Sequence, residues 1–241
     1  MPSYCGLVGL CLVLAGLANC CGQAVPRPQT LIGYSELLTN LPGGRFANAS
    51  TTRAMVVRAD GTGRRELARS LASSPNSWTQ FCGWSDDGRQ AFIYAGWEDP
   101  ENAAWEEAHQ SFRMDPGKWL LDCYVLDLTT GNLANLTEVE RVSNYNSGLF
   151  CWPGDPERYG FTALSGGESH PFSMRLDGTD KRDLAQGSGF AYGFSASPDG
   201  KRIAYHKDYQ VYLADADGGH PARIETGNPF NFVPTWSPDG Q

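Results

Sequence analysis

The stretch SASPDGKRIAY, residues 195–205, decides the fold. Its centre, Ser-Pro-Asp-Gly, is a tight-turn sequence, because Pro presets φ for the turn and Gly accepts the positive φ that ends it. The residues after the turn alternate in polarity, which is the pattern of a β-strand. The stretch therefore predicts two antiparallel strands joined by a short turn.

The same turn recurs along the chain. It reads WSDDG at residues 84–88 and WSPDG at residues 236–240, and a degenerate copy, WPGDP, occupies residues 152–156. The residues that mark these turns are Trp84, Trp152, Trp236, Gly88, Gly200 and Gly240. Because Trp84 and Trp236 hold the same place, where Ala196 stands in another copy, we expect both Trp side chains to be buried near their turns.

A second turn follows each of these turns and comes directly after a short apolar strand. Its glycines are Gly131, Gly178 and Gly218, which are 47 and 40 positions apart. Two turns in each unit imply four strands. A period of about 40–45 residues with four strands is the mark of a β-propeller blade.

Composition agrees with an all-β chain. Gly and Pro contribute 28 and 15 of the 241 residues, which is too turn-rich for a helical bundle, and the 41% of hydrophobic residues are too many for a disordered chain. The turns predict four-stranded antiparallel blades: an irregular first blade over 31–71, three more over 77–138, 146–187 and 189–227, and the first strand of a fifth over 231–236. This is an incomplete ring, either cut from a longer parent or an open arc that a partner or a second copy closes.

The order of these motifs resembles the WD-like repeat of the TolB β-propeller family. The shared features are the Trp-Ser-Pro-Asp-Gly turn, the strand after it, the Asp-Gly turn and a Leu-Thr ending at Leu136-Thr137, and they cover roughly residues 31–241. The same repeat also resembles that of oligogalacturonate lyases and of the propeller domain in prolyl-oligopeptidase-like enzymes. The resemblance therefore implies the fold more sharply than the function.

The first 24 residues read as a secretory signal peptide. Residues 5–18 carry no charge and are too few to span a bilayer, and Gly22-Gln23-Ala24 supplies small residues for a cut after Ala24. The mature chain, 25–241, is then periplasmic or secreted and has no transmembrane span. The alternative is a lipoprotein anchored at Cys20, because residues 17–20 resemble a lipobox.

Charge and cysteine content narrow the class of protein. The 19 Lys and Arg against 27 Asp and Glu give a net charge of −8, which argues against nucleic acid as a partner. Only Cys82, Cys123 and Cys151 lie outside the leader, so we expect small buried hydrophobes rather than a disulfide scaffold.

One blade carries a long insertion, residues 97–119. Within it Asp99 as N-cap and Pro100 as first residue predict a helix over 100–111. Trp105, Ala108 and Phe112 lie on one apolar face of that helix, and Glu101, Glu106 and Glu107 lie on the other. We expect either a lid or partner-docking helix, or an insertion packed on the propeller.

The candidate ligand-binding residues lie on one predicted side of the blades. The turns between strands 1 and 2 and between strands 3 and 4 share one side, and the longer loops share the other. On the loop side the sequence places His109, His170, His206, Asp208 and Glu168, whereas His220 lies on the turn side. Three His could hold a divalent metal, as the resemblance to oligogalacturonate lyases implies, but no close His spacing such as HxH is present. We therefore expect no cofactor, with a divalent metal as the alternative.

Two functions fit these observations. The first is an exported, non-catalytic scaffold that binds a protein or carbohydrate ligand on the loop side, for which the resemblance implies an envelope setting and partners such as peptidoglycan-associated lipoproteins. The second is an enzyme: a metal-dependent polysaccharide lyase, or the propeller portion of a prolyl-oligopeptidase-like enzyme. We favour the scaffold, because no catalytic constellation is evident and a net charge of −8 disfavours an anionic polysaccharide.

Overall fold

A computed structural model describes residues 30–39, 50–113, 115, 117–137, 145–165, 168–185 and 187–240. The described strands and the helix lie in one compact unit, Leu31–Gln241. Strands make up 52% and helices 8%, which confirms the all-β prediction. The signal peptide predicted over 1–24, the lipobox and Cys20 lie outside the described residues. Among the described residues, no helix has the length and apolar character needed to cross a membrane.

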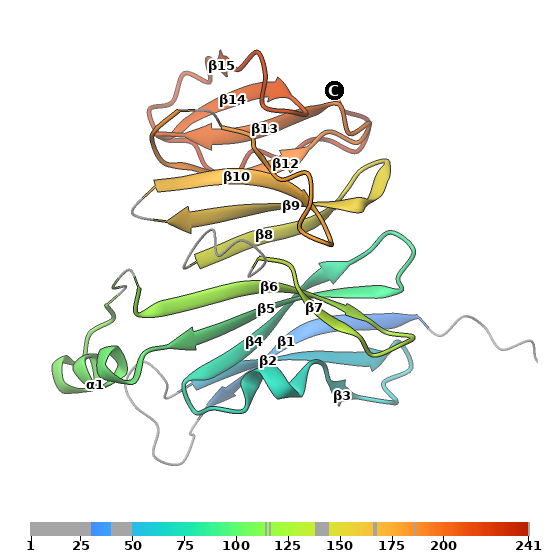
Figure 1. Cartoon of the computed structure of the whole chain (residues 1–241), viewed down its shortest axis with the longest axis vertical. Coiled ribbons are helices and arrows are strands. Elements are labelled where there is room, and N and C mark those ends of the chain that lie inside the picture. The colour runs from blue at the N-terminus through green and yellow to red at the C-terminus, as the bar shows by residue number, and fades with distance from the viewer. Residues whose placement is uncertain are drawn as a thin grey trace, which may run out of the picture. The chain divides into compact units, whose positions relative to one another are not determined.

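The strands form four antiparallel blades in chain order (Figure 1). The first blade holds β1 (Leu31–Thr39), β2 (Ser50–Arg58) and β3 (Arg65–Glu66), and a 3-10 turn, η1 (Arg69–Ala72), follows. The second holds β4 (Ser77–Trp84), β5 (Gln90–Glu98), β6 (Trp119–Asp127) and β7 (Leu133–Asn135), with α1 (Pro100–His109) between β5 and β6. The third holds β8 (Tyr145–Trp152), β9 (Asp155–Ser165), β10 (Glu168–Arg175) and β11 (Arg182–Asp183). The fourth holds β12 (Ala191–Ala196), β13 (Arg202–Lys207), β14 (Gln210–Asp215) and β15 (Ala222–Ile224).

Neighbouring blades touch at equivalent places. Leu121 in β6 pairs in parallel with Tyr145 in β8, and Ser169 in β10 makes the corresponding parallel bridge to Phe190, just before β12. Both bridges join the start of a blade's third strand to the start of the next blade's inner strand. The repeat predicted from sequence is therefore also a repeat of contacts between blades.

The Ser-x-Asp-Gly turns form by the predicted chemistry. In each, the Ser hydroxyl donates to the Asp carboxylate two residues later, over 2.8 Å at Ser85, 2.6 Å at Ser197 and 2.6 Å at Ser237. The Gly that ends each turn has a positive φ, between 68° and 72° at Gly88, Gly200 and Gly240. The turn sequence alone therefore fixes where the inner hairpins reverse.

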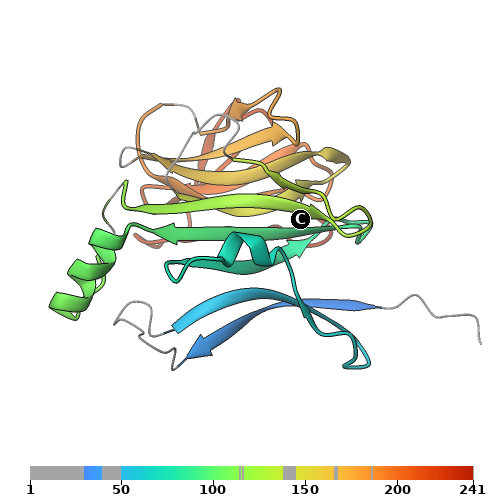
Figure 2. The same cartoon turned by 60° about the horizontal axis from the view of Figure 1, so that its bottom comes forward.

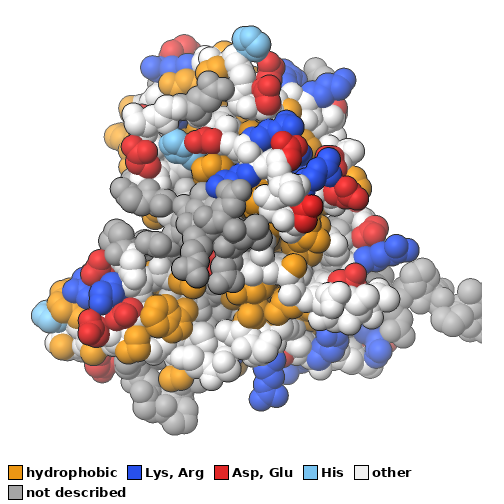
Figure 3. All heavy atoms as spheres, in the orientation of Figure 1, with side chains coloured by type: hydrophobic (Ala, Val, Ile, Leu, Met, Phe, Trp, Pro, Cys, Tyr) orange, Lys and Arg blue, Asp and Glu red, His pale blue; other side chains and the backbone are white. Residues whose placement is uncertain are grey.

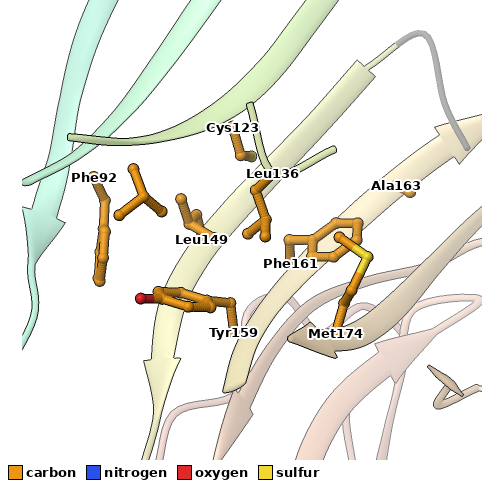
Figure 4. Close-up of a cluster of buried hydrophobic side chains, with 9 residues drawn as sticks. Phe92, Cys123, Leu136, Leu149, Tyr159, Phe161, Ala163 and Met174 are labelled. Carbon is orange, nitrogen blue, oxygen red and sulfur yellow. The ribbon is translucent and has the colours of Figure 1, made fainter. Parts of the chain in front are cut away.

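Apolar clusters fill the three spaces between successive blades. The cluster between the second and third blades contains Phe92, Val125 and Leu136 from one side and Tyr159, Phe161 and Met174 from the other (Figure 4). In each cluster a Leu just after the outermost strand is fully or almost fully buried: Leu67, Leu136 and Leu184. Burial between sheets, rather than within one sheet, therefore holds the blades together.

The repeat Trp residues differ in burial, and the two for which burial was predicted, Trp84 and Trp236, are not the buried ones. Trp152 is buried, and its indole N–H donates to the carbonyl of Gly200 in the next blade over 3.1 Å. Trp84 and Trp236 are only half-buried, so their predicted burial is wrong. The reason at Trp84 is that its ring packs on Phe81 of its own strand at 4.8 Å. At Trp236 one ring face meets the Arg202 guanidinium at 4.7 Å, close to solvent.

Residues 231–236, which were predicted to form an inner strand, do not form a β-strand. The hydrogen bonds of Val233 to His206 and of the Trp236 indole to the Ser195 carbonyl nevertheless place this segment against the fourth blade as an inner strand would lie. A strand assignment requires a ladder partner, and among the described residues this segment has none.

Candidate functional site

His109 is the last residue of α1 and is exposed. Its ring stacks on Trp105 at 4.1 Å, and its Nδ1 lies 2.8 Å from the Trp105 carbonyl oxygen. The Arg113 guanidinium lies 4.4 Å from the centre of the same indole ring. His109 is therefore part of a local stack at the end of the helix.

His170 lies near the start of β10 and pairs with a carboxylate. Its Nδ1 is 2.7 Å from an Asp183 oxygen on the neighbouring outer strand, and its Nε2 is buried without a hydrogen-bond partner. Glu168, two residues earlier, is exposed. The Asp183 contact fixes the imidazole orientation, as a carboxylate does when it accepts the ring N–H of a metal-binding His.

His206, near the end of β13, is the most deeply buried of the three, at 2% exposure. Its Nδ1 accepts the Val233 backbone N–H over 3.3 Å, and the rings of Tyr192 and Phe232 stand edge-on to it. Burial lowers the pKa of His206, so the neutral imidazole is favoured. Asp208 follows at the strand end with φ of 48° and donates its N–H to the Phe190 carbonyl.

The position of His206 recurs in other blades with other residues. Ser35 in β1 accepts the Phe81 N–H on its hydroxyl over 3.0 Å, and the Tyr94 hydroxyl in β5 accepts the Leu149 N–H over 3.0 Å. The strand β1 holds the same place in its blade as β5 and β13 hold in theirs, because Ile32 pairs with Val57 as Ala91 pairs with Leu126. In all three cases a side chain on this strand accepts a backbone N–H from the inner strand, or inner segment, that follows. The donating residue always lies three positions before the repeat Trp. His206 therefore links a blade to the segment that follows it, a role that sequence inspection of this His alone did not reveal.

The loop-side His residues do not form a joint metal site. Among the described residues, no group of three or more His, Cys, Asp or Glu side chains is arranged to hold a metal ion. His109, His170 and His206 each engage partners of their own, as given above. The ligand-binding role predicted for these three, Asp208 and Glu168 stays a prediction.

The turn side carries two pockets. One, of about 240 Å³, lies between the third and fourth blades and is lined by Trp152, Arg158, Arg182 and Asp199 among others. The second, of about 390 Å³, is lined by Gln90, Tyr159, Arg175 and Asp177 among others. His220 also lies on this side, as predicted, and its bond to Asp215 raises its pKa. The sequence had placed the ligand on the opposite side.

The free thiols are held away from reactive chemistry. Cys123 is buried and Cys82 and Cys151 are half-buried, all without a disulfide partner. Burial raises the pKa of Cys82 to about 12 and that of Cys123 well above its usual value. These thiols remain protonated at neutral pH and pack as small hydrophobes, in line with the sequence expectation.

Helix α1 begins as predicted and ends two residues earlier than predicted. The Asp99 carboxylate accepts the backbone N–H of Glu101 over 2.9 Å and of Asn102 over 3.4 Å, which confirms the N-cap. The helix ends at His109 because Gln110 takes a left-handed conformation, with φ of 49°. Figure 2 shows α1 beyond the end of the second blade's strands.

Helix α1 does not bury the apolar face that the sequence indicates. The buried residues are Asn102, Ala103 and Glu106, whereas Ala108 is exposed and Phe112, just past the helix, is 60% exposed. The apolar face of Trp105, Ala108 and Phe112 is therefore not the face that packs on the sheet. The physical reason is a network of buried hydrogen bonds between polar side chains of the helix, Glu98 of β5 and Arg113.

Asn102 is the centre of that network. Its side-chain amide donates to a Glu98 oxygen over 3.0 Å and to the Arg113 carbonyl over 3.0 Å, and its carbonyl accepts from the Arg113 guanidinium over 2.7 Å. Glu106 accepts the Arg113 backbone N–H over 2.7 Å, and the Trp119 indole donates to the Arg113 carbonyl over 3.0 Å. Glu98, Asn102 and Arg113 were not predicted from the sequence. The pattern that could have indicated the network is the i, i+4 spacing of the polar residues Glu98, Asn102 and Glu106.

The outward side of the insertion is aromatic and apolar. Phe112, Trp97 and Leu120 are exposed, and Trp97 and Leu120 lie opposite each other on β5 and β6. Phe112 packs on Trp119 at 5.6 Å, and Trp119 packs in turn on Trp78 at 5.2 Å. We call Trp97, Trp105, Phe112 and Leu120 the insertion surface; Figure 3 shows apolar side chains exposed in this region at the lower left, among charged ones.

Comparison with solved structures supports the fold. No protein-family model matches the chain, and no curated protein matches it in sequence. A TolB protein from Acinetobacter baumannii is similar over 86% of this chain and 45% of its own, with a TM-score of 0.52 and 20% identity. A TolB-type protein from Agrobacterium tumefaciens is similar over 79% of this chain and 63% of its own, with a TM-score of 0.51 and 20% identity.

An oligogalacturonate lyase from Vibrio parahaemolyticus shows a comparable likeness, with a TM-score of 0.51 and 13% identity over 78% of this chain and 51% of its own. This chain therefore spans about half to two thirds of the length of these structures. Sequence identities at this level speak for the fold alone. The motif order, the blades and these likenesses agree, and the fold of the chain is that of a TolB-like β-propeller, present here as an incomplete ring.

Proposed function

We propose that this chain is an exported TolB-like propeller that acts as a non-catalytic protein-binding scaffold in the cell envelope, with the α1 insertion as its docking element. The observation that carries the proposal is the orientation of the insertion: the Asn102 amide and the Glu106 carboxylate are buried, whereas Phe112 is exposed and Trp105 is half-buried. Exposed apolar patches of this kind mark protein-interaction sites.

The buried network makes the insertion surface a preorganised one. Asn102, Glu106 and Glu98 are fully buried and tie the helix and Arg113 to β5. A docking surface held in one conformation avoids the ordering cost that a flexible loop incurs on binding. The Trp105 ring, held between His109 and Arg113, and Phe112 are the aromatic anchors that interfaces favour.

The envelope setting is supported by two features. The first is the signal peptide predicted over residues 1–24. The second is the TolB-like fold, found in structures of bacterial TolB proteins. The predicted partner class, a peptidoglycan-associated lipoprotein, follows from the sequence resemblance and gives the first probe.

The test is a calorimetric titration of the chain with the peptidoglycan-associated lipoprotein of the same organism. We expect binding by the wild-type chain and a loss of at least about tenfold for Trp105→Ala and for Phe112→Ala, as for aromatic anchors. His220→Ala, on the turn side, is the matched control and should bind as wild type does. Absence of wild-type binding, or equal binding by all variants, would refute the docking role.

A metal-dependent lyase is the second candidate, and one observation favours it. The Asp183 carboxylate orients His170 as carboxylates orient metal-binding His residues. Titration with Mn²⁺ should then show binding that His170→Ala abolishes and His220→Ala leaves unchanged. If Mn²⁺ fails to bind, or binds equally to both variants, this candidate is excluded.

A further inference from the structure

The larger of the two turn-side pockets, of about 390 Å³, lies between the second and third blades. Gln90, at the start of β5, comes from the second blade. The third blade contributes residues of β9, of the end of β10 and of the turn after β10: Pro156, Glu157, Tyr159, Arg175, Leu176 and Asp177. Both blades have a blade on either side, so the walls of this pocket belong to a complete inter-blade contact. The volume is within the range of small-molecule sites, ~300–1,000 Å³.

A hydrogen bond between the two blades fixes one wall of the pocket. The Tyr159 hydroxyl donates to the Gln90 side-chain oxygen over 2.6 Å. Burial raises the pKa of Tyr159 to about 12, so the phenol stays protonated at neutral pH and keeps this bond. The Tyr159 ring is 1% exposed and packs in the apolar cluster of Figure 4. This wall is therefore held in place before any ligand binds, which reduces the ordering cost of binding.

The residues that line the pocket carry an excess of negative charge. Two of them are carboxylates, Glu157 and Asp177, and one is a guanidinium, Arg175, which leaves one negative charge over. Arg175 is already engaged, because it donates to Glu157 over 2.9 Å and lies 3.8 Å from an Asp155 oxygen. Asp155, outside the lining, also lies 3.7 Å from the Arg158 guanidinium, which balances it. The charge left over is therefore that of Asp177.

The Asp177 carboxylate is held by its own turn and has one oxygen to spare. Its Oδ1 accepts the Thr179 hydroxyl over 2.7 Å and the Thr179 backbone N–H over 2.9 Å. These two bonds lower the pKa of Asp177, so the group is ionised at neutral pH. Its Oδ2 has no hydrogen-bond partner among the described residues. A ligand that donates to Oδ2 would therefore leave the turn undisturbed.

The pocket also has an apolar side, formed by Pro156 and Leu176. Leu176 packs against the same buried cluster as Tyr159. A ligand with one positive charge and an aliphatic chain matches this combination, because the charge compensates Asp177 and the chain covers the apolar side. An anion would be repelled, and a neutral ligand would cover the carboxylate without compensating its charge. The chemistry therefore favours a primary alkylammonium ion, whose three N–H groups donate to carboxylate oxygens.

We propose that this pocket binds a primary alkylammonium group, with the ammonium on Asp177 and the aliphatic chain along Pro156 and Leu176. A free polyamine and a lysine side chain of another polypeptide both carry this group. The pocket shares no residue with the insertion surface, so the site is independent of the scaffold function proposed above.

The test is an NMR titration of the isotope-labelled chain with two probes. Cadaverine represents a free polyamine, and Nα-acetyl-lysine N-methylamide represents a lysine side chain in a polypeptide. At least one probe should bind saturably, shift the resonances of residues 156–159 and 175–179, and leave those of α1 unchanged. Binding of one probe alone would assign the site to that source of the ammonium group, and binding of both would assign it to the group from either source.

Asp177→Asn removes the charge but keeps an oxygen that can accept from Thr179. It should weaken binding by at least about tenfold, as the loss of a hydrogen bond to a charged group does. Asp217→Asn is the matched control, because Asp217 holds the same turn position in the fourth blade, accepts the Gly219 N–H over 2.9 Å and lines neither pocket. It changes the net charge by the same amount and should bind as the wild type does.

The norleucine counterpart of the lysine probe lacks only the ammonium group and should not bind. Three results would overturn the proposal: no saturable binding of either probe, shifts confined to other residues, or equal weakening by Asp177→Asn and Asp217→Asn. The last result would show a general attraction of amines to an acidic chain. Binding of the norleucine compound as tightly as the lysine probe would also overturn it, because the charge would then play no part.

Discussion

Leu184 and Ile224 hold the same position in consecutive blades, yet Leu184 is fully buried and Ile224 is 38% exposed. Each comes at the end of a blade's outermost strand, and Leu184 faces the fourth blade. Leu184 meets Ile203, Tyr205 and Ala214 of the fourth blade in one cluster. The difference therefore arises from what covers the residue and not from its place in its own sheet.

This pair gives a direct measure of the inter-blade contact. Leu184→Ala should lower the free energy of unfolding by about 2–5 kcal/mol, because a fully buried Leu leaves a cavity. Ile224→Ala should cost less than about 1 kcal/mol, measured where the chain is monomeric, since a large part of that side chain is already in solvent. Urea denaturation checks both values, and equal losses would contradict the blade assignment.

Gly160 in β9 is a second sensitive position. A Cβ there would lie 2.4 Å from the Phe150 ring and 2.8 Å from the Phe194 ring, so two aromatic residues of successive inner strands would have to move. We expect Gly160→Ala to destabilise the chain by about 1–3 kcal/mol through overpacking. In Gly83→Ala the new Cβ would meet Phe92 at an ordinary 3.6 Å, so this variant is the control and should change stability far less. Thermal unfolding of the two variants, side by side, decides the matter.

Turn chemistry explains why so much of the fold was predictable. At Ser197 and Asp199 the contacts that shape the turn lie within five residues, so the local sequence contains them. The spacing of such turns then gives the blades. Burial of Trp84 was not predictable in this way, because it depends on whether the ring meets the next blade, as Trp152 does, or its own strand.

The candidate site was harder to predict because its contacts, like those of Trp84, depend on residues far away in the sequence. The sequence predicted His206 as a ligand-binding residue close to Asp208, but its hydrogen-bond partner is the Val233 backbone, 27 residues further along the chain. The start of the helix was predicted correctly from Asp99 and Pro100, but the residues that it buries were not predicted. Apolar spacing pointed to Phe112, whereas a network of buried polar groups around Asn102 decides the orientation.

That network predicts the effect of removing its centre. Asn102→Ala removes the amide that donates to Glu98 and to the Arg113 carbonyl, and it leaves those buried acceptors without this donor. We expect a loss of about 1–3 kcal/mol, confined to the insertion, because the buried network loses its central hydrogen bonds. Hydrogen exchange should quicken across residues 100–113 and stay unchanged in β12–β15. Glu107→Ala, at an exposed position of the same helix, is the control; similar exchange in both variants would mean that the network does not hold α1.

The last prediction concerns pH and follows from His206. Its ring is buried, so the folded state favours neutral imidazole and the pKa of His206 lies below the ordinary value, and its Nδ1 accepts the Val233 N–H. The unfolded chain, with a His pKa near about 6.5, therefore takes up a proton before the folded chain does. The resulting stability is fully present above that pH and is lost as pH falls through it toward the folded pKa. His220 acts in the opposite sense, because Asp215 raises its pKa, but it is fully exposed and screened by solvent.

Urea denaturation from pH 7.5 to pH 5, roughly spanning this range, should show wild-type stability falling with pH. His206→Gln should flatten that fall, and His220→Gln should leave it essentially unchanged. Equal slopes for the wild type and His206→Gln would show that His206 does not couple proton uptake to the contact between the fourth blade and Val233.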